Sequence, residues 1–275
     1  MESLFLVMAT LCYLSGTVGY LVYLFKDREQ LHRISWTIML AGAVLHGVAL
    51  VMHTVDTGRL PLASTQEALS LFAWVFVVTY LVLQIRLQLR ILGSFVSPLA
   101  VVFMLSSSLL PSHIILKSES FRSGWVIVHV ASLFLANAMF ALAFSLGVMY
   151  LLQERYIKRK NFGFLYERLP SLERIDSIAH YCLMSGFPLM TAGLITGFAY
   201  AAVVWHSPWN WDPKEILSLV TWIIYAVLVH ERLAVGWRGR RAAWLSILGF
   251  SATLLTFVGA SLLLSGHHSV LSGKM

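Results

Sequence analysis

Apolar residues occupy long uninterrupted stretches of this chain, and short polar connections separate the stretches. The stretches are about twice as long as the roughly ten-residue strands of a membrane barrel, and they do not alternate in polarity. Because every backbone N–H and C=O in hydrocarbon must be paired internally, such stretches predict transmembrane helices. The pattern predicts eight spans, at about 3–25, 34–54, 67–85, 91–111, 124–153, 179–204, 216–231 and 242–265.

Three of these spans have features of their own. The first lacks a basic leading region and a small-residue cleavage site, so we expect a retained helix and not a signal peptide. The span at 124–153 is long enough to tilt or to project beyond the hydrocarbon. The span at 216–231 is short for a crossing that needs about 20 residues, which suggests that the segment before it dips into the membrane edge.

Composition supports a membrane protein. The chain has 58% hydrophobic and only 12% charged residues, with a mean hydropathy of +0.76, whereas a soluble domain carries about 25% charged residues. We therefore expect an all-α polytopic membrane protein, with residues 1–275 forming a single domain. Cys12 and Cys182 form no CxxC, CxxCH or zinc-binding spacing, which excludes thiol oxidoreductases and covalent attachment of a haem to this chain.

The positive charge follows membrane topology. A net charge of +7 could indicate nucleic acid, but the lysines and arginines are distributed unevenly among the connections. If the amino terminus lies outside, the inward connections carry all of the 20 basic residues except Arg59, Lys117, Arg122, Lys214 and Lys274. The positive-inside rule then places both termini on the outer face, and the expected partner is a lipid bilayer and no nucleic acid. The basic connection at 154–178 is expected to be either a short interfacial helix or a solvated loop.

Three tryptophans gather in the connection before the seventh span. The segment WHSPWNWDPKE contains Trp205, Trp209 and Trp211 and ends in Asp212-Pro-Lys-Glu. Tryptophans of an interfacial belt are the alternative, but these are usually scattered around helix ends. So many indoles in one short connection indicate a platform for a large flat apolar ligand, at about residues 202–217. Asp212 also suits the N-cap of the following helix, and Pro213 suits its first turn.

These residues resemble the WWD signature of haem-handling membrane proteins, and the chain is most similar to the CcsA/ResC-type subunit of cytochrome c synthase. The family pattern reads W-G-x-x-W-x-W-D-P-K-E, and His206 stands here in place of the glycine. The segment TGRLPLASTQEALSLFAW at 57–74 resembles the family's P-L-x-x-x-x-E-x-L, and His268-Ser269 resembles its downstream histidine and serine. The resemblance implies a haem-binding, iron-containing membrane protein of the bacterial inner membrane, with the WWD segment facing the periplasm.

Histidines supply the candidate iron ligands, since ionisable groups at membrane depth are candidates for function. His129 lies five residues into the fifth span, or about 7 Å deep, and His267 and His268 follow the eighth span on the same side. Two imidazoles from different segments beside the tryptophans would suit the two axial positions of haem. The alternative for His129 is an interfacial histidine hydrogen-bonded to a helix carbonyl. The resemblance implies that His129 and His268 are the pair, and His267 remains a rival to His268.

A second histidine group lies deeper or on the inner side. The resemblance implies an internal haem ligand at His230, which closes the seventh span. His46 is the deep histidine of the second span and is our candidate for its partner, with His53 two helical turns further along the same face. The alternative for His46 is a core histidine bonded to a neighbouring helix.

The resemblance further implies a mechanism and its partners. Haem b would pass from the His230 and His46 position to the outer platform, for covalent attachment to the CxxCH motif of apocytochrome c in system II maturation. Because no residue suggests a general acid or base, positioning would be the main catalytic contribution of this subunit of a cytochrome c synthase (haem lyase). The second subunit would be of the ResB/CcsB type. The alternatives are a stand-alone HemX-like haem-binding protein, a CcmC-type delivery subunit, and a b-type electron carrier oxidising quinol.

Overall fold

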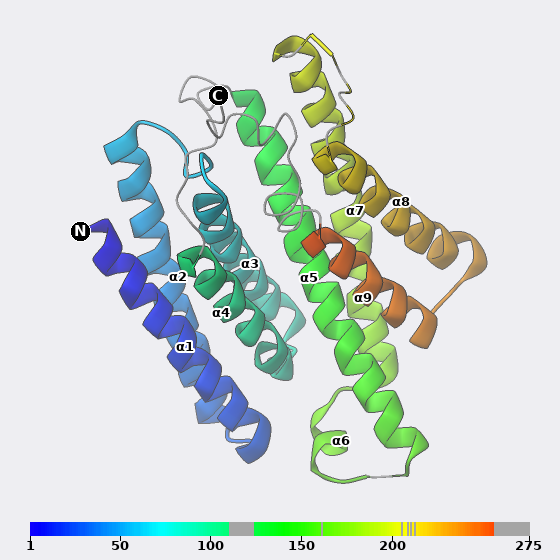
Figure 1. Cartoon of the computed structure of the whole chain (residues 1–275). Helices are drawn as coiled ribbons and strands as arrows, with labels where there is room; N and C mark the ends of the chain where they lie inside the picture. The colour runs from blue at the N-terminus through cyan, green and yellow to red at the C-terminus, as the bar shows by residue number, and fades with distance from the viewer. Residues whose placement is uncertain are drawn as a thin grey trace. The chain divides into compact units, whose positions relative to one another are not determined.

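The computed structural model contains helices as its only regular elements among the residues that it describes, as expected (Figure 1). It describes residues 1–109, 124–160, 162–204, 206–207, 209, 211 and 213–255, with the backbone alone for residues 204, 213 and 214. Within these residues, seven helices are long and apolar enough to cross a membrane. The prediction of a polytopic all-α membrane protein is therefore confirmed, and the orientation of the termini stays a prediction.

The helices match the predicted spans closely. They are α1 (Glu2–Lys26), α2 (Glu29–Thr57), α3 (Thr65–Leu87), η1 (Arg90–Leu92), α4 (Gly93–Leu109), α5 (Gly124–Lys158), α6 (Phe164–Arg168), α7 (Leu172–Val204), α8 (Pro213–His230), η3 (Glu231–Val235) and α9 (Arg240–Leu254). The first seven predicted spans each overlap one of them. The eighth begins as α9, and its predicted end at 265 lies outside the described residues.

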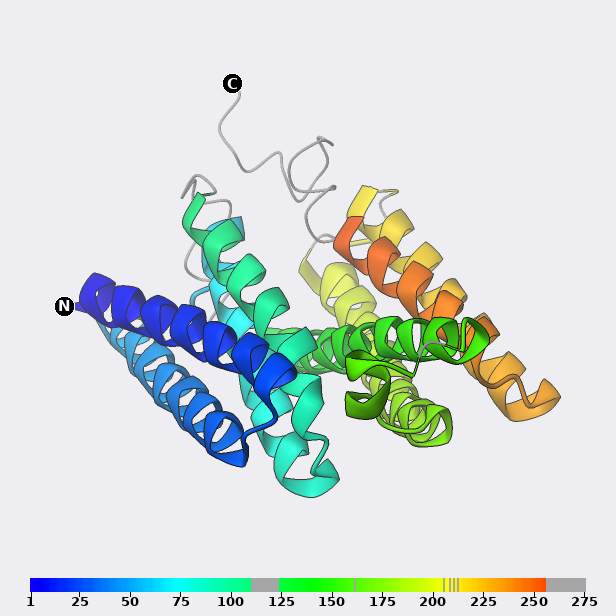
Figure 2. The ribbon, with the colours of Figure 1, turned by 90° about the horizontal axis from the view of Figure 1, so that it is seen from below.

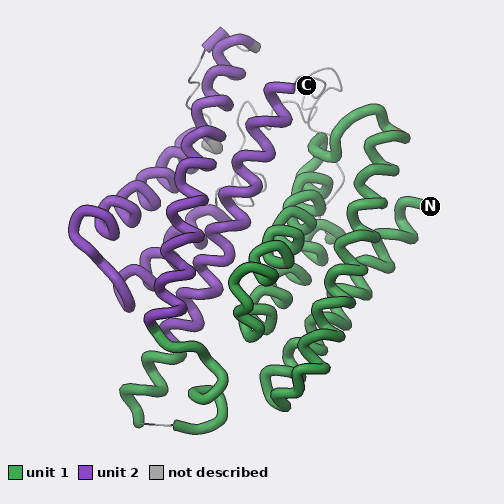
Figure 3. Tube along the Cα trace, turned by 180° about the vertical axis from the view of Figure 1, so that it is seen from behind, with its two compact units in different colours: residues 1–112, 152–172 green, residues 113–151, 173–275 purple. Residues whose placement is uncertain are grey.

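Two compact units make up the chain (Figure 3). Unit 1 comprises residues 1–112 and 152–172, and unit 2 comprises residues 113–151 and 173–275. In unit 1, α1 packs along α2 and also against α4, and α3 packs against α4; the pairing of α1 with α2 is visible in Figure 2. The division does not test the prediction that residues 1–275 form a single transmembrane domain, which stays a prediction.

Small residues let the helices of unit 1 approach closely, as is usual where no hydrophobic effect drives helices together in lipid. A Cβ on Gly16 would lie 2.8 Å from Met39 Cγ, and one on Gly42 would lie 2.8 Å from Cys12 Cβ. Buried hydroxyls are paired at the same interfaces: Tyr80 donates to the hydroxyl of Tyr20 at 2.9 Å. Each of these glycines therefore fixes a helix contact that a larger residue would open.

The connection at 154–178 combines features of both expectations. It is shorter than predicted, because α5 continues to Lys158 and α7 already begins at Leu172. Between them lies the short α6, whose Phe164 ring stacks on Phe25 of α1 with ring centroids 5.3 Å apart. Arg168 forms an ion pair with Asp27. The connection thus docks on one end of α1 and is not simply solvated.

Aromatic contacts hold the helices of unit 2 together. Phe140 of α5 stacks on Tyr225 of α8 with centroids 3.6 Å apart. Trp222 of α8 donates its indole N–H to the Thr191 hydroxyl of α7 at 2.9 Å. These contacts hold α8 against both α5 and α7. The start of α5 and the end of α7 carry the candidate site.

The seventh span is longer than the sequence predicted. After His230 the helix continues as a π-helix, so the apolar stretch runs from Glu215 to Val235 over 21 residues. The sequence prediction ended the span before Arg232 because that residue is charged. In the structure, the guanidinium of Arg232 pairs with the carboxylate of Asp176 of α7 at 2.6 Å. The prediction of a short seventh span was wrong. The length of this span therefore gives no support for a Trp-rich segment that dips into the membrane edge.

Candidate functional site

His129 lies at the end of unit 2 where α5 begins and α7 ends. Its Nδ1 donates to the carbonyl of Gly193 at 2.7 Å, and its ring is half-buried. Donation by Nδ1 assigns the proton to that nitrogen, so the lone pair of the neutral imidazole resides on Nε2. A histidine that ligates a metal usually donates its other ring N–H to a carbonyl or carboxylate in this way. The hydrogen bond to a helix carbonyl, which was the alternative to a ligand role for His129, is therefore present. It is compatible with iron binding through Nε2.

Glycines on α7 create the space for this ring. A Cβ on Gly197 would lie 2.6 Å from Cε1 and 3.0 Å from Nδ1 of His129, and a Cβ on Gly193 would lie 2.7 Å from Leu133 Cγ. Gly193 and Gly197 are four residues apart and share one helix face. The sequence analysis missed both residues, although the G-x-x-x-G spacing in an apolar span is a signal of close helix contact.

Aromatic rings continue from this point into the Trp-rich segment. Phe198 follows Gly197, and its ring lies 5.7 Å from that of Trp209. Trp209 and Trp211 meet edge to face at 5.6 Å, and Trp211 is 74% exposed. The structure thus places His129 and two of the predicted tryptophans at the same end of α7.

The remaining residues of the predicted platform are only partly covered by the structure. Helix α8 begins at Pro213, which confirms the expected position of that proline. Trp205, Asp212, His267 and His268 lie outside the described residues, so their predicted roles stay predictions.

His206 occupies the position of the family glycine and adopts the conformation that favours glycine. Its φ is +56°, in the left-handed region that other residues enter at a cost, although histidine tolerates it better than most. The turn geometry expected from the family pattern is therefore retained with a histidine.

This conformation predicts an asymmetric response to substitution. His206→Gly should leave the melting temperature unchanged or raise it, whereas His206→Val should lower stability by on the order of 1 kcal/mol, since a β-branched residue suffers most at positive φ. Thermal unfolding of the purified variants measures the difference. A glycine variant less stable than the valine variant would contradict the prediction.

The other two candidate histidines have contrasting surroundings. His230 is exposed at the end of α8, directly before the π-helical turn, a feature that often accompanies functional positions. His46 in unit 1 is fully buried, with Nδ1 3.3 Å from the Tyr13 hydroxyl and Nε2 3.0 Å from the Ser70 hydroxyl. Binding iron through His46 therefore requires the loss of one of these hydrogen bonds.

Comparison with known proteins defines the class of the chain. The profile of the cytochrome c assembly protein family matches residues 62–268. The chain therefore belongs to this family of polytopic membrane proteins, and its role lies in cytochrome c maturation. The matched range includes His129, His230, His267 and His268 and excludes His46.

The individual relatives agree with the predicted branch. The cytochrome c biogenesis protein CcsA of Guillardia theta is 27% identical over 269 residues, which cover 91% of this chain and 89% of the relative. The CcsA protein of Mesostigma viride is 30% identical over 249 residues, covering 82% of each chain. The resemblance to CcsA-type proteins is confirmed.

A solved structure shares the fold. The cytochrome c haem lyase CcmF superposes with a TM-score of 0.65 at 17% identity, covering 99% of this chain and 48% of that one. This chain thus spans about half the length of CcmF. At this identity the likeness establishes the fold alone.

Proposed function

We propose that the end of unit 2 formed by α5, α7 and the Trp-rich segment binds haem b as a substrate and presents it to apocytochrome c. The observation that carries this proposal is the His129 hydrogen bond to Gly193 at 2.7 Å, which directs the lone pair of the imidazole to Nε2. Close contact with Gly197 fixes the plane of the ring. A ring held in this way binds iron with little further loss of conformational freedom.

The tryptophans provide the apolar surface that a porphyrin needs. Trp211 exposes 74% of its surface in the described structure, and burial of apolar area is worth about 25 cal/mol per Å². With Trp209 and Trp205, it covers the faces of the bound ligand. Asp212 contributes from the same segment by capping α8, the helix that begins at Pro213.

His268 would hold the haem iron together with His129, and His267 is its rival for that role. Ligation by two imidazoles would leave no open site for oxygen. The bound haem supplies the vinyl groups that react with cysteine thiols. The residues of this chain bind and orient that ligand beside the CxxCH motif, which raises the effective concentration of the reacting groups.

An inner position receives the haem first. His230, exposed at the end of α8, is the proposed ligand there. The expectation that His46 is its partner stays a sequence prediction, since His46 belongs to unit 1 and His230 to unit 2. His46 is already hydrogen-bonded to Tyr13 and Ser70. If His46 takes part, its substitution by alanine should therefore alter the spectrum of the inner haem as well as the packing of unit 1.

The surroundings of the protein follow from the same proposal. The chain works with a ResB/CcsB-type membrane subunit in the bacterial inner membrane, with the Trp-rich segment facing the periplasm. Both units then act as the single haem-handling domain predicted from the sequence.

Co-expression with the partner subunit tests this function. In a host without its own maturation system, the two subunits together should attach haem covalently to a CxxCH reporter, and neither should do so alone. If the reporter stays free of haem although this chain binds haem, the protein is a stand-alone haem-binding protein. Reduction of the bound haem by quinol without covalent attachment would instead identify an electron carrier.

Gly197 offers a sharper test of the His129 geometry. Gly197→Ala places a methyl group 2.6 Å from His129 Cε1 and displaces the ring. We expect haem affinity to fall about 10–100-fold, the usual effect of disturbing the residues that orient a metal ligand. Gly124→Ala is the matched control, because no atom of the described residues lies within 4 Å of its added Cβ. Haem titration followed by absorbance measures both variants, and equal affinities would contradict the assigned geometry.

A further inference from the structure

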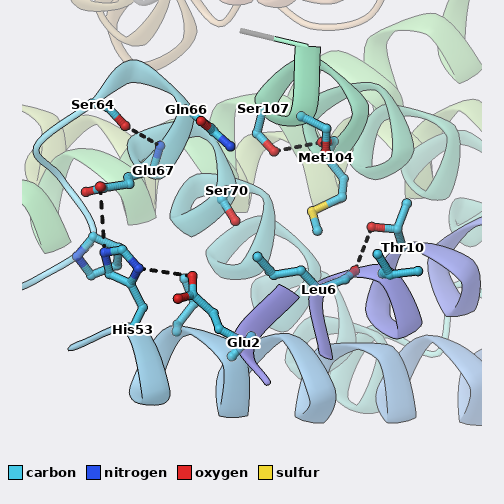
Figure 4. A pocket seen from close by; sticks show the side chains of 15 residues that line it. Glu2, Leu6, Thr10, His53, Ser64, Gln66, Glu67, Ser70, Met104 and Ser107 are labelled. Carbon is cyan, nitrogen blue, oxygen red and sulfur yellow. Dashed lines mark hydrogen bonds and ion pairs between the residues drawn. The ribbon is translucent and has the colours of Figure 1, made fainter. Parts of the chain in front are cut away.

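Unit 1 contains a cavity of about 320 Å³ at the end where α1 and α3 begin and α2 and α4 end (Figure 4). The proposed haem chemistry does not use it. Aliphatic side chains form part of its wall, among them Leu6, Leu50 and Met104. Three ionisable side chains from three helices converge on the cavity: Glu2, His53 and Glu67.

His53 lies between the carboxylates of Glu2 and Glu67, as Figure 4 shows. Its Nδ1 lies 3.0 Å from a carboxylate oxygen of Glu2, and its Nε2 lies 3.6 Å from a carboxylate oxygen of Glu67. The Nε2 atom is buried and has no hydrogen-bond partner among the described residues. With the proton on Nδ1, the lone pair of Nε2 faces a carboxylate across a gap too long for a hydrogen bond.

This arrangement lacks a hydrogen-bond donor. A buried polar atom without a partner is unfavourable, because it has lost its hydrogen bonds to water without replacement. A group with several N–H bonds, placed in the cavity, could donate to Nε2 of His53 and to both carboxylates at once. The side-chain hydroxyls of Ser64 and Ser70 add acceptors on the α3 side.

The charges around the cavity favour a cation. The Glu67 carboxylate is balanced by Arg59, whose guanidinium donates to it twice, at 2.6 and 2.9 Å. These hydrogen bonds raise the pKa of Arg59, so its charge persists. Glu2 faces only His53 among the ionisable groups of the cavity, and α4 contributes Met104, Ser107 and Ser108, which carry no charge. Among the described residues, no lysine or arginine forms an ion pair with Glu2, whose partner is His53.

We propose that this cavity binds the primary ammonium headgroup of a phospholipid. The cavity lies at helix ends, which is the depth of lipid headgroups. Val7 lines the cavity and is 56% exposed, so the edge of the cavity reaches an exposed apolar face of α1. An ammonium group supplies three N–H donors for the three acceptors, whereas a trimethylammonium group supplies none.

Native mass spectrometry of the full-length protein tests the proposal. The delipidated protein is titrated with phosphatidylethanolamine, with phosphatidylcholine of the same acyl chains, and with free ethanolamine as the soluble source of the ammonium group. We expect about tenfold tighter binding of phosphatidylethanolamine than of phosphatidylcholine, a difference of about 1.4 kcal/mol, because only the primary ammonium group donates hydrogen bonds. Competition by free ethanolamine would show that the ammonium group alone suffices, and its absence would show that the lipid body is also needed.

Substitutions in the cavity test whether it causes the preference for phosphatidylethanolamine. Glu2→Gln and His53→Gln should abolish the preference, and Glu29→Gln, which changes an exposed carboxylate paired with Arg33, should retain it. Equal binding of the two lipids by the wild type would overturn the proposal. A preference that survives Glu2→Gln would overturn it as well. Haem binding through His129 should be unchanged in each variant, so failure here is distinguishable from failure of the proposed function.

Discussion

His129→Ala should abolish the formation of covalent cytochrome c while leaving the protein folded in the membrane. The substitution removes the imidazole whose Nδ1 donates to Gly193, and with it the proposed iron ligand of the outer platform. Loss of residues that merely orient a ligand costs about 10–100-fold, so loss of the ligand itself should exceed about 100-fold. The yield of haem-stained reporter in cells that also carry the partner subunit measures this effect.

A second histidine of unit 2 provides the control. His180 on α7 is half-buried like His129, and its substitution removes the same volume and the same ring. His180→Ala should retain at least about half of the reporter yield, because His180 lies near the start of α7, away from the end of that helix that contacts His129. Equal losses for both variants would point to a general effect on folding and would count against the ligand role of His129.

The largest effect on stability should follow from breaking the ion pair between Arg232 and Asp176. The Arg232 side chain is only 3% exposed, and its guanidinium lies 2.6 Å from the Asp176 carboxylate. The same carboxylate oxygen accepts the backbone N–H of Gly239 at 3.0 Å. It therefore ties the start of α7 to both the π-helical turn η3 and the turn before α9.

Removal of one partner leaves a buried charge without compensation. Asp176→Ala should destabilise unit 2 by about 3–5 kcal/mol, and so should Arg232→Ala. The double variant Arg232→Met with Asp176→Leu should lose less than either single variant, because both charges disappear together and apolar volume replaces them. Its remaining loss comes from the Gly239 N–H, which then has no acceptor at that position.

Thermal unfolding in detergent measures the three variants. Arg33→Ala is the comparison, since its ion pair with Glu29 is exposed on both sides and should matter little. If the double variant is the least stable of the set, the ion pair itself contributes net stability and our description of it is wrong.

The sequence predicted the helices well because hydrocarbon permits few other structures for long apolar stretches. It failed where a charge lies inside a helix. Arg232 looked like the end of the seventh span, and its partner Asp176 is 56 residues earlier in the chain, where no local pattern points to it. Pairings between distant residues depend on how helices pack, and periodicity along one helix does not contain that information.

The candidate site was predictable in its residue types but not in its geometry. The tryptophans and His129 were evident from the density of indoles and from the depth of one histidine. The acceptor for His129 was not, because a backbone carbonyl has no signature in the sequence. The spacing of Gly193 and Gly197 indicates a close helix contact, but it does not show that the ring of His129 packs there. The cavity around His53 is a similar case, since it joins residues from four helices.

The most direct test is the absorption spectrum of the purified protein from cells with ample haem. A six-coordinate low-spin haem in the wild type, converted to another coordination state by His129→Ala, is the predicted result. A preparation without bound haem, both alone and with its partner subunit, would contradict the central claim that this end of unit 2 holds haem.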